Sequence, residues 1–367
     1  MFSSDAYRKS MAKSRSGRGA TLNHESTRFQ PQQREADGDW LDAREQLDGA
    51  PPKLRTTVTV EHPRTIIARN TSPDVPFDRS INPYRGCEHG CIYCFARPTH
   101  AFHDLSPGLD FETRLFAKPD APALLRAEIA KPGYVCQAIA FGTNTDPYQP
   151  IEGDWRVTRG CIEVLADCDH PLTITTKSDR VVRDIDLLGP MAAKGLAAVM
   201  ISITSLDRRI AMTVEPRAPA PERRLAAVRT LTDAGVPVFV SIAPVIPAIT
   251  DHEIEHLLER AADAGATSAS YIPVRLPWEV APLFEAWLDT HFPDRKAKVM
   301  ATIASLRDGK RNDPNFFTRM RGSGPWAELL AMRFQIAAKK HGLSRDRVRV
   351  RTDLFRPPRG PQGDLFG

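Results

Sequence analysis

Short apolar runs alternate with amphipathic stretches along most of the chain from about residue 56. The apolar runs are four to seven residues long and rich in β-branched residues, which is typical of strands. The longer stretches carry apolar residues three or four positions apart, which is typical of helices that bury one face. The sequence predicts strands over 56–60, 64–68, 138–141, 172–176, 197–203, 236–242 and 268–272, and helices over 122–131, 156–167, 180–194, 221–234, 251–264 and 278–290.

Strands that alternate with helices of this length indicate parallel βαβ units. Gly195, Gly235 and Gly265 each stand where a predicted helix should end, as a left-handed C-terminal cap requires. Six such units predict an α/β fold, a partial (β/α)6 TIM-like barrel. The pattern alone leaves an open doubly wound sheet as the alternative.

Both ends of the chain depart from this alternation. Residues 1–55 are polar and lack lasting periodicity, so we expect a disordered tail, with the core domain over 56–300. Residues 301–361 form a C-terminal extension, predicted helical to residue 344 and able to cover the open side of a partial barrel. Within the extension, arginines alternate with valines over 345–351, which predicts an edge strand.

Length and charge set broad limits on the function. The 367 residues are enough for one large domain with its own core. The formal net charge of +5 permits an anionic partner without requiring one. No apolar run reaches the length of a membrane span and no secretory signal is visible, so we expect a cytoplasmic protein whose thiols stay reduced.

Three of the six cysteines lie in one short segment, as Cys87, Cys91 and Cys94. This spacing can bring three thiolates to one metal centre. It supplies one ligand fewer than a closed tetrahedral zinc site or a fully ligated 4Fe–4S cluster needs. A zinc ion would take a histidine as its fourth ligand, for which the nearby candidates are His89, His100 and His103.

The loop resembles the signature of the radical S-adenosylmethionine (SAM) superfamily, in which an aromatic residue, here Tyr93, precedes the last cysteine. The resemblance extends over about residues 80–275. Two further motifs, Thr-Asp-Pro-Tyr-Gln-Pro-Ile-Glu over 145–152 and Thr-Lys-Ser over 176–178, are similar to the spore photoproduct lyase-like branch, and more closely to bacterial radical SAM proteins of unassigned activity.

The resemblance implies the cofactors and the reaction. Three irons of a 4Fe–4S cluster take the thiolates of Cys87, Cys91 and Cys94, and the fourth iron chelates SAM. A flavodoxin- or ferredoxin-like donor supplies one electron. SAM is then cleaved to methionine and a 5′-deoxyadenosyl radical, which abstracts hydrogen from a substrate that the sequence does not assign, with nucleic acid as one candidate.

Polar residues at the ends of the predicted strands are the candidates to hold SAM, because chemistry gathers at the carboxyl ends of parallel strands. A proline-bounded loop that carries Glu215 and Arg217 is expected to face the substrate. The candidate cofactor-binding residues are Thr143, Asn144, Asp146, Lys177, Ser178, Ser202, Thr204 and Tyr93.

Other functions are weighed against this one. Spore photoproduct lyase uses a cysteine as hydrogen donor where this chain has Thr143, and a tyrosine where it has Phe95. A threonine O–H bond is too strong for that role, so a DNA repair lyase of this type is disfavoured. Auxiliary clusters would favour a peptide-modifying enzyme, but the remaining cysteines are scattered and are predicted to be buried apolar residues: Cys136, Cys161 and Cys168.

The last residues, 362–367, suggest a docking tail. The segment Gln362–Phe366 resembles the short peptides with which bacterial DNA enzymes bind the replicative sliding clamp, with two adjacent apolar anchors. With the cysteine loop, this tail also fits a non-catalytic DNA-associated adaptor with a zinc- or cluster-stabilised domain.

Overall fold

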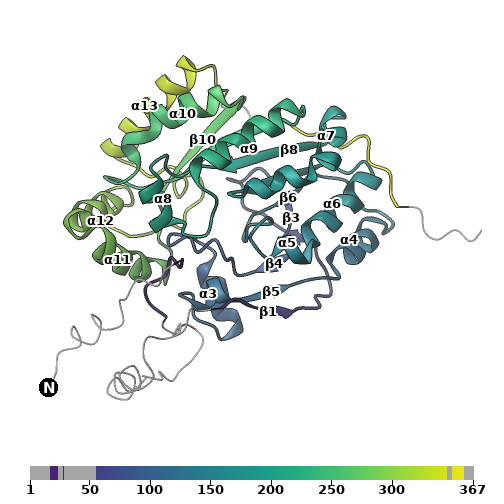
Figure 1. The fold of residues 1–367 in the computed structure, drawn as a ribbon, viewed down its shortest axis with the longest axis horizontal. Helices are drawn as coiled ribbons and strands as arrows, with labels where there is room; N and C mark the ends of the chain where they lie inside the picture. Colours follow the sequence, from purple (N-terminus) through teal and green to yellow (C-terminus); the bar gives the residue numbers. More distant parts are fainter. Residues whose placement is uncertain (1–16, 24–27, 29–54, 345–348, 359–367) are drawn as a thin grey trace, which may run out of the picture.

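The computed structural model describes residues 17–23, 28, 55–344 and 349–358. Within this part, the main sheet has seven strands in the order β10-β9-β8-β7-β6-β3-β2 (Figure 1). Neighbouring strands from β3 to β10 are parallel, and the predicted α/β fold with six parallel strands is confirmed. These strands are β3 (Arg79–Ile81), β6 (Ile139–Phe141), β7 (Leu172–Thr176), β8 (Ala197–Ser202), β9 (Val238–Val245) and β10 (Ser268–Pro273).

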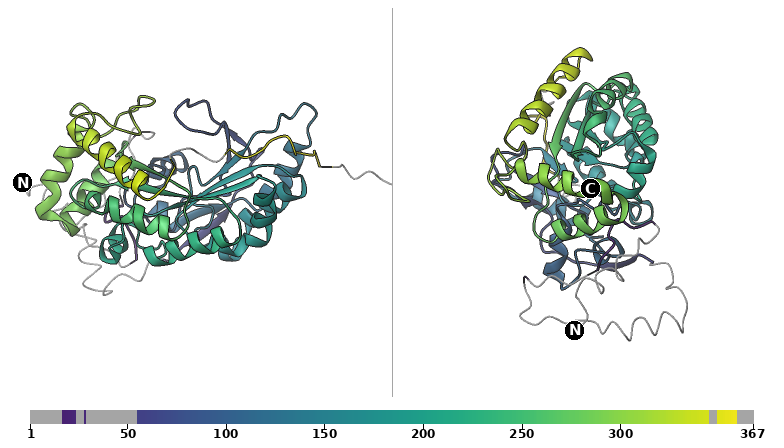
Figure 2. Two further views of the ribbon diagram at one scale, coloured as in Figure 1. Left: turned by 90° about the horizontal axis from the view of Figure 1, so that it is seen from above. Right: turned by 90° about the vertical axis from the view of Figure 1, so that its left-hand side faces the viewer.

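The helices that connect the strands cover one face of this sheet (Figure 2, left). Three of them are followed by the predicted glycine caps, and Gly195, Gly235 and Gly265 have φ angles of 72°, 76° and 96°. Only a residue without a Cβ adopts this conformation readily, so the caps are confirmed. The helices are α4 (Ala121–Ile129), α6 (Val157–Asp167), α7 (Ile185–Ala193), α9 (Pro221–Asp233), α10 (Ile254–Asp263) and α11 (Val280–His291).

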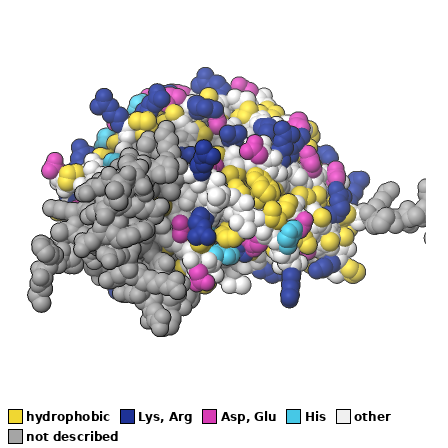
Figure 3. Space-filling view, turned by 60° about the horizontal axis from the view of Figure 1, so that its bottom comes forward, with side chains coloured by type: hydrophobic (Ala, Val, Ile, Leu, Met, Phe, Trp, Pro, Cys, Tyr) yellow, Lys and Arg dark blue, Asp and Glu magenta, His cyan; other side chains and the backbone are white. Residues whose placement is uncertain are grey.

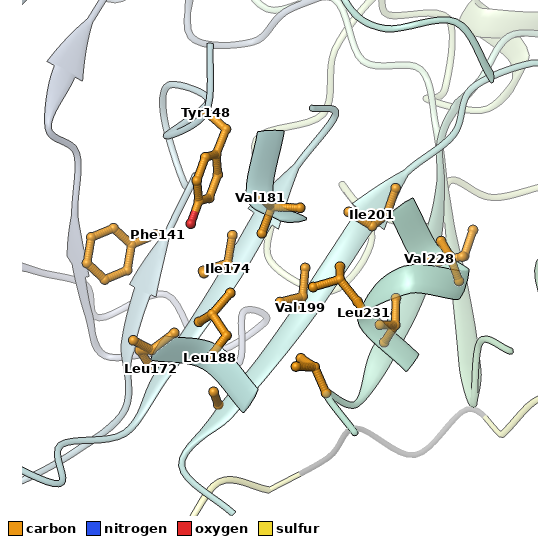
Figure 4. Close-up of a cluster of buried hydrophobic side chains, with 14 of the residues drawn as sticks. Phe141, Tyr148, Leu172, Ile174, Val181, Leu188, Val199, Ile201, Val228 and Leu231 are labelled. Atoms are coloured by element: carbon orange, nitrogen blue, oxygen red, sulfur yellow. The ribbon is translucent and has the colours of Figure 1, made fainter. Parts of the chain in front are cut away.

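The core lies between the sheet and these helices. Leu172 and Ile174 of β7 and Val199 of β8 are buried, and they pack with Leu188 of α7 in one apolar cluster (Figure 4). Burying one such side chain stabilises the fold by about 1.5–3 kcal/mol. This packing holds the strands in register, and with them the loops at their carboxyl ends.

The predicted start of the barrel is wrong. Residues 57–60 do form a strand, β1 (Thr57–Val60), but it pairs with β5 (Arg114–Ala117) in a separate three-stranded sheet completed by β4 (Tyr84–Arg85). Of the predicted strand 64–68, only Ala68 is extended, in β2 (Ala68–Arg69). The first barrel strand is β3, whose residues Arg79 and Ser80 are buried and polar, so that no apolar run marks it.

A short N-terminal segment packs against the cysteine loop. The amides of Gly19 and Ala20 donate hydrogen bonds of 3.0 and 2.8 Å to the Glu112 carboxylate. The backbone of Gly19 runs so close to Gly90 that a Cβ on Gly19 would lie 1.7 Å from the Gly90 carbonyl oxygen. The prediction of a disordered tail is therefore wrong for residues 17–23, and most of the rest of 1–55 lies outside the described residues.

The C-terminal extension is helical in two pieces, α12 (Lys296–Ser305) and α13 (Pro325–Lys340). The prediction of helix over 326–340 is confirmed, whereas residues 306–324 between the two helices form a non-helical loop. This loop and the segment 70–78 lie on the side of the sheet that the connecting helices leave open (Figure 2, left).

Two predictions at the C-terminus fall wholly or partly outside the described residues. Residues 345–348 of the predicted edge strand are not described, and 349–351 are not a strand. The segment Gln362–Phe366, with its predicted docking function, also lies outside the described part.

The surface is mixed in character. Among the described residues, no helix is both long and apolar enough to cross a bilayer. On the face that Figure 3 shows, basic and acidic side chains are interspersed and a group of hydrophobic side chains lies near the centre. This face carries no single extended basic patch.

Candidate functional site

The cysteine loop follows β3 and lies at the carboxyl edge of the parallel sheet. Cys87 and Cys91 are buried and Cys94 is half-buried. Cys94 packs against the apolar clusters that contain Cys87 and Cys91, so the fold brings the three predicted ligands together. Among the described residues, no three His, Cys, Asp or Glu side chains are arranged with metal-ligand spacing. The assignment of the three ligands therefore rests on their sequence pattern, burial and proximity.

Two glycines let the loop turn tightly against its surroundings. Gly86 and Gly90 have φ angles of 70° and 67°. A Cβ on Gly86 would lie 2.6 Å from the side chain of Leu115 and 2.8 Å from the carbonyl oxygen of Phe111. A larger residue at position 86 would therefore displace the loop that carries Cys87.

A buried ion pair holds the middle of the loop. The Arg97 guanidinium contacts the Glu112 carboxylate at 2.5 Å, and both side chains are fully buried. Arg97 also donates hydrogen bonds to the carbonyl oxygens of Cys91 (2.9 Å) and Gly90 (3.1 Å). A charge buried in this way needs full pairing, and here the pairing fixes the backbone of a predicted cluster ligand.

The motif over 145–152 follows β6, the second barrel strand, and its side chains hydrogen-bond to the cysteine loop. The Gln149 amide donates to the Gly86 carbonyl oxygen at 3.0 Å and accepts from the Glu88 amide at 2.9 Å. Asp146 accepts hydrogen bonds from the Thr176 hydroxyl (2.6 Å) and the Lys177 amide (2.7 Å). One of its oxygens also lies 3.3 Å from Nδ1 of His89.

Asp146 therefore joins the ends of β6 and β7 to the cysteine loop. Burial alone would raise its pKa, but His89, Thr176 and the Lys177 amide lower it to about 2. The carboxylate is charged at neutral pH and its oxygens are engaged within the protein. Its predicted contact with SAM remains a prediction.

The pKa of Asp146 predicts an acid-dependent loss of stability. A carboxyl whose pKa is about 2 in the fold against 3.8 ordinarily stabilises the fold by about 2 kcal/mol above pH 4. That contribution declines as the pH falls from 4 through 2, and it vanishes below pH 2, where the carboxyl is protonated in both states. We expect Asp146→Asn to lower the free energy of unfolding at pH 6 and to cost progressively less between pH 4 and pH 3, as measured by urea denaturation. If Asp146→Asn lowered the free energy of unfolding equally at pH 6 and at pH 3, the lowered pKa of Asp146 would be contradicted.

A second buried network lies on the other side of Cys91. Tyr93 donates a hydrogen bond to Glu215, whose carboxylate also accepts one from Thr204 at 2.6 Å. Glu215 forms an ion pair with Arg224 at 2.5 Å, and both are at least 98% buried. Burial would raise the pKa of Glu215, but Arg224 and Lys177 lower it below its ordinary value.

The expectation that Glu215 and Arg217 face the substrate is thus wrong for Glu215. The loop folds back on the cysteine loop, where the Ile92 amide donates to the Val214 carbonyl oxygen at 3.1 Å. Arg217 pairs with Glu88 at 3.0 Å, and its amide donates to the carbonyl oxygen of His89. The proline-bounded loop therefore serves to pack the cysteine loop against the end of β8.

Lys177 is the predicted SAM contact with the most suitable charge. Its ammonium group lies 5.7 Å from the ring centre of Tyr93. Burial lowers the pKa of Lys177, but Cys91, Glu215 and Asp146 together raise it above its ordinary value. The structure thus places a cation beside a predicted cluster ligand.

The remaining candidates are half-buried or buried, and each makes a hydrogen bond within the protein. Thr143 and the amide of Asn144 hydrogen-bond to Asn82, which directly follows β3 and which the sequence did not single out. Ser178 caps the 3-10 helix Asp179–Asp184, since its hydroxyl accepts from the Arg180 amide at 3.2 Å. Ser202 is buried within β8, and its carbonyl oxygen accepts a hydrogen bond from Arg224.

The three thiols supply one ligand fewer than a closed tetrahedral zinc site needs. Burial raises the pKa of Cys87, and raises that of Cys91 to about 12, so both thiols are protonated until a cation displaces the protons. Of the proposed fourth zinc ligands, His89 is paired with Asp146 and His100 contacts the Arg114 carbonyl oxygen at 2.9 Å. His103 packs on the ring of Phe116.

Comparisons with known proteins agree with this geometry. The family model described as Radical SAM superfamily matches residues 81–261. An uncharacterized protein of Mycobacterium tuberculosis (strain ATCC 25618 / H37Rv) is 38% identical over 222 residues, covering 60% of this chain and 65% of the relative. A radical SAM Nalpha-GlyT isomerase of Pseudomonas phage M6 is 22% identical, covering 60% of this chain and 44% of the relative. The chain thus spans less than two thirds of the length of these curated relatives.

Among solved structures, a spore photoproduct lyase complexed with a dinucleoside spore photoproduct is similar in fold. Its TM-score is 0.55 at 18% identity, and the match covers 78% of this chain and 80% of that one. The superfamily uses a 4Fe–4S cluster and SAM, in agreement with the predicted cofactors. The cysteine loop and the candidate SAM contacts all lie within residues 81–261, the region that matches the radical SAM superfamily.

Proposed function

We propose that this protein is a radical SAM enzyme that holds a 4Fe–4S cluster on Cys87, Cys91 and Cys94. When bound, the cluster supplies the electron that cleaves SAM, and the resulting 5′-deoxyadenosyl radical abstracts hydrogen from the substrate. One observation supports this most directly: three thiols lie on a loop that two buried networks fix at the carboxyl edge of a parallel sheet. A flavodoxin- or ferredoxin-like protein is the proposed electron donor.

In this proposal the chain orients SAM and excludes water. Lys177 would bind the SAM carboxylate as a point charge beside Cys91, since the positive charge favours an anion there. The hydroxyl groups of Tyr93 and Thr204 are already bound to Glu215, so these two residues would shape the site more than bind SAM directly. Thr143 and Asn144 are half-buried at the same edge and remain candidates to contact SAM.

Anaerobic reconstitution tests the proposal. With iron, sulfide and SAM, we expect a brown protein that carries about four irons. Reduction with dithionite should release 5′-deoxyadenosine in amounts that exceed the protein. A colourless protein with one zinc per chain would contradict the cluster, and a brown protein that never cleaves SAM would favour the non-catalytic adaptor.

We propose nucleic acid as the substrate class. The similar spore photoproduct lyase is complexed with a dinucleoside, and this chain carries the half-buried Arg275 beside the exposed ring of Phe95, next to the cysteine loop. Thr143 cannot donate a hydrogen atom as a thiol does, so the proposed reaction differs from photoproduct reversal. Release of 5′-deoxyadenosine should rise when single-stranded DNA or RNA is added.

A further inference from the structure

An arginine–aromatic pair bridges the open side of the sheet next to the cysteine loop. Phe95 directly follows Cys94, and Arg275 comes two residues after β10 ends. Its guanidinium carbon lies 5.7 Å from the ring centre of Phe95. Because β10 is one edge of the sheet and β3 lies near the other, this contact joins the two sides of the barrel opening.

The positive charge of Arg275 is not neutralised by an acid. Among the described residues its guanidinium contacts the Phe95 ring and makes no hydrogen bond or ion pair. Burial, Arg319 and Arg307 lower the pKa of Arg275 to about 10, whereas Asp74, which is itself paired with Arg319, raises it by less. Of these, Arg307 is 97% buried, and its guanidinium donates to the carbonyl oxygen of Val274 at 2.8 Å.

A second arginine–aromatic pair continues this surface. Arg319 lies 4.8 Å from the ring centre of Phe316 and forms a bidentate ion pair with Asp74 at 2.6 and 2.5 Å. Phe316 and Phe317 are 47% and 62% exposed. Asp74 pairs with Arg319, and the buried Arg307 lies near Asp313, so among the described residues Arg275 is the half-buried arginine of this group that has no ion pair.

We propose that Arg275 and Phe95 bind single-stranded nucleic acid at the barrel opening, the guanidinium holding a phosphodiester and the ring stacking on an unpaired base. The strand continues over Arg319 and Phe316. Every base has a flat face and every nucleotide a phosphate, which is what alternating rings and arginines recognise. The two faces of a base inside a duplex are covered by the neighbouring base pairs, so stacking on Phe95 requires an unpaired or extruded base.

This inference rests on the proposed function, because nucleic acid is the substrate class proposed there. Its test measures binding alone. A fluorescein-labelled single-stranded oligonucleotide is titrated with the reconstituted protein, and anisotropy gives the dissociation constant at several salt concentrations. Arg275→Ala should weaken binding about tenfold at physiological salt. It should also reduce the slope of log affinity against log salt by about 0.7, as expected for one lost phosphate contact on a single strand.

Two further variants make the test specific. Phe95→Leu keeps an apolar side chain beside Cys94 but removes the stacking face, so it should weaken binding without changing the salt slope. Arg126→Ala, on the helical side of the molecule where Arg126 pairs with Asp167, should leave binding unchanged. Iron content and 5′-deoxyadenosine release without oligonucleotide are measured for each variant, since neither should change in Arg275→Ala.

Unchanged binding in Arg275→Ala would overturn the inference, as would tighter binding to a duplex or to polyglutamate than to a single strand. If the wild type binds no oligonucleotide yet releases 5′-deoxyadenosine, this inference fails while the proposed function stands. If the wild type binds the single strand through Arg275 but never cleaves SAM, the proposed function fails, and the inferred nucleic-acid binding by Arg275 and Phe95 is upheld.

Discussion

Replacing Cys91 by alanine is expected to abolish both the iron–sulfur cluster and the reductive cleavage of SAM. With two thiolates left, the loop cannot hold three irons, and the side chains close by are committed elsewhere, as His89 is to Asp146. Iron and sulfide per chain should fall from about four to below one after reconstitution, and no 5′-deoxyadenosine should form. The same result is expected for Cys87→Ala and Cys94→Ala.

Cys136→Ala is the matched control, since Cys136 is half-buried and lies outside the cysteine loop. This variant should keep the full iron content and the wild-type rate. Retention of a four-iron cluster in Cys91→Ala would show that another side chain is a ligand, and would remove the basis of the proposed function. Circular dichroism of both variants would separate loss of the cluster from loss of the fold.

Glu112→Ala is expected to cause the largest loss of stability. It leaves the Arg97 guanidinium buried without its counter-ion and frees the amides of Gly19 and Ala20. Breaking a buried pair in this way costs about 3–5 kcal/mol, because an uncompensated charge remains in the interior. Because Arg97 also fixes the backbone at Cys91, incorporation of iron should fall together with the unfolding midpoint in urea.

Asp289→Ala removes the acid of a surface pair, Lys296–Asp289, and is the comparison for this experiment. Exposed pairs contribute about 0–1 kcal/mol, so its unfolding midpoint should stay close to that of the wild type. Should Glu112→Ala unfold at the same urea concentration as Asp289→Ala, the brace formed by Arg97 and Glu112 would not stabilise the cysteine loop.

The regular part of the fold could be predicted because its strands bury at least one face and consist of apolar and β-branched residues. Leu172–Thr176 matches the prediction residue for residue, and the glycine caps followed from helical periodicity. The first barrel strand was missed for the opposite reason. Its buried Arg79 is paired with the neighbouring Asp78 and donates to the carbonyl oxygen of Val135, contacts that no local pattern reveals.

The candidate site was predicted in part. The cysteines were found because their spacing is short and local. The residues that position them were not found, because Arg97, Glu112 and Gln149 act through contacts with distant segments. Polar residues at strand ends were all read as candidate SAM contacts, whereas Ser178 is engaged in a cap and Asp146 in a network within the protein.

The close approach of Gly19 to Gly90 affects where the protein can be divided. An expression fragment cut at the family boundaries, 81–261, would lack the residues that cover Glu112, and so would one that starts at residue 56. Either fragment would expose the Glu112 carboxylate to solvent, whereas it is fully buried in the whole chain. Bulky fusions or side chains introduced at position 19 would have the same effect, so the N-terminal segment belongs to the folded unit that holds the cysteine loop, although it lies outside the matched region.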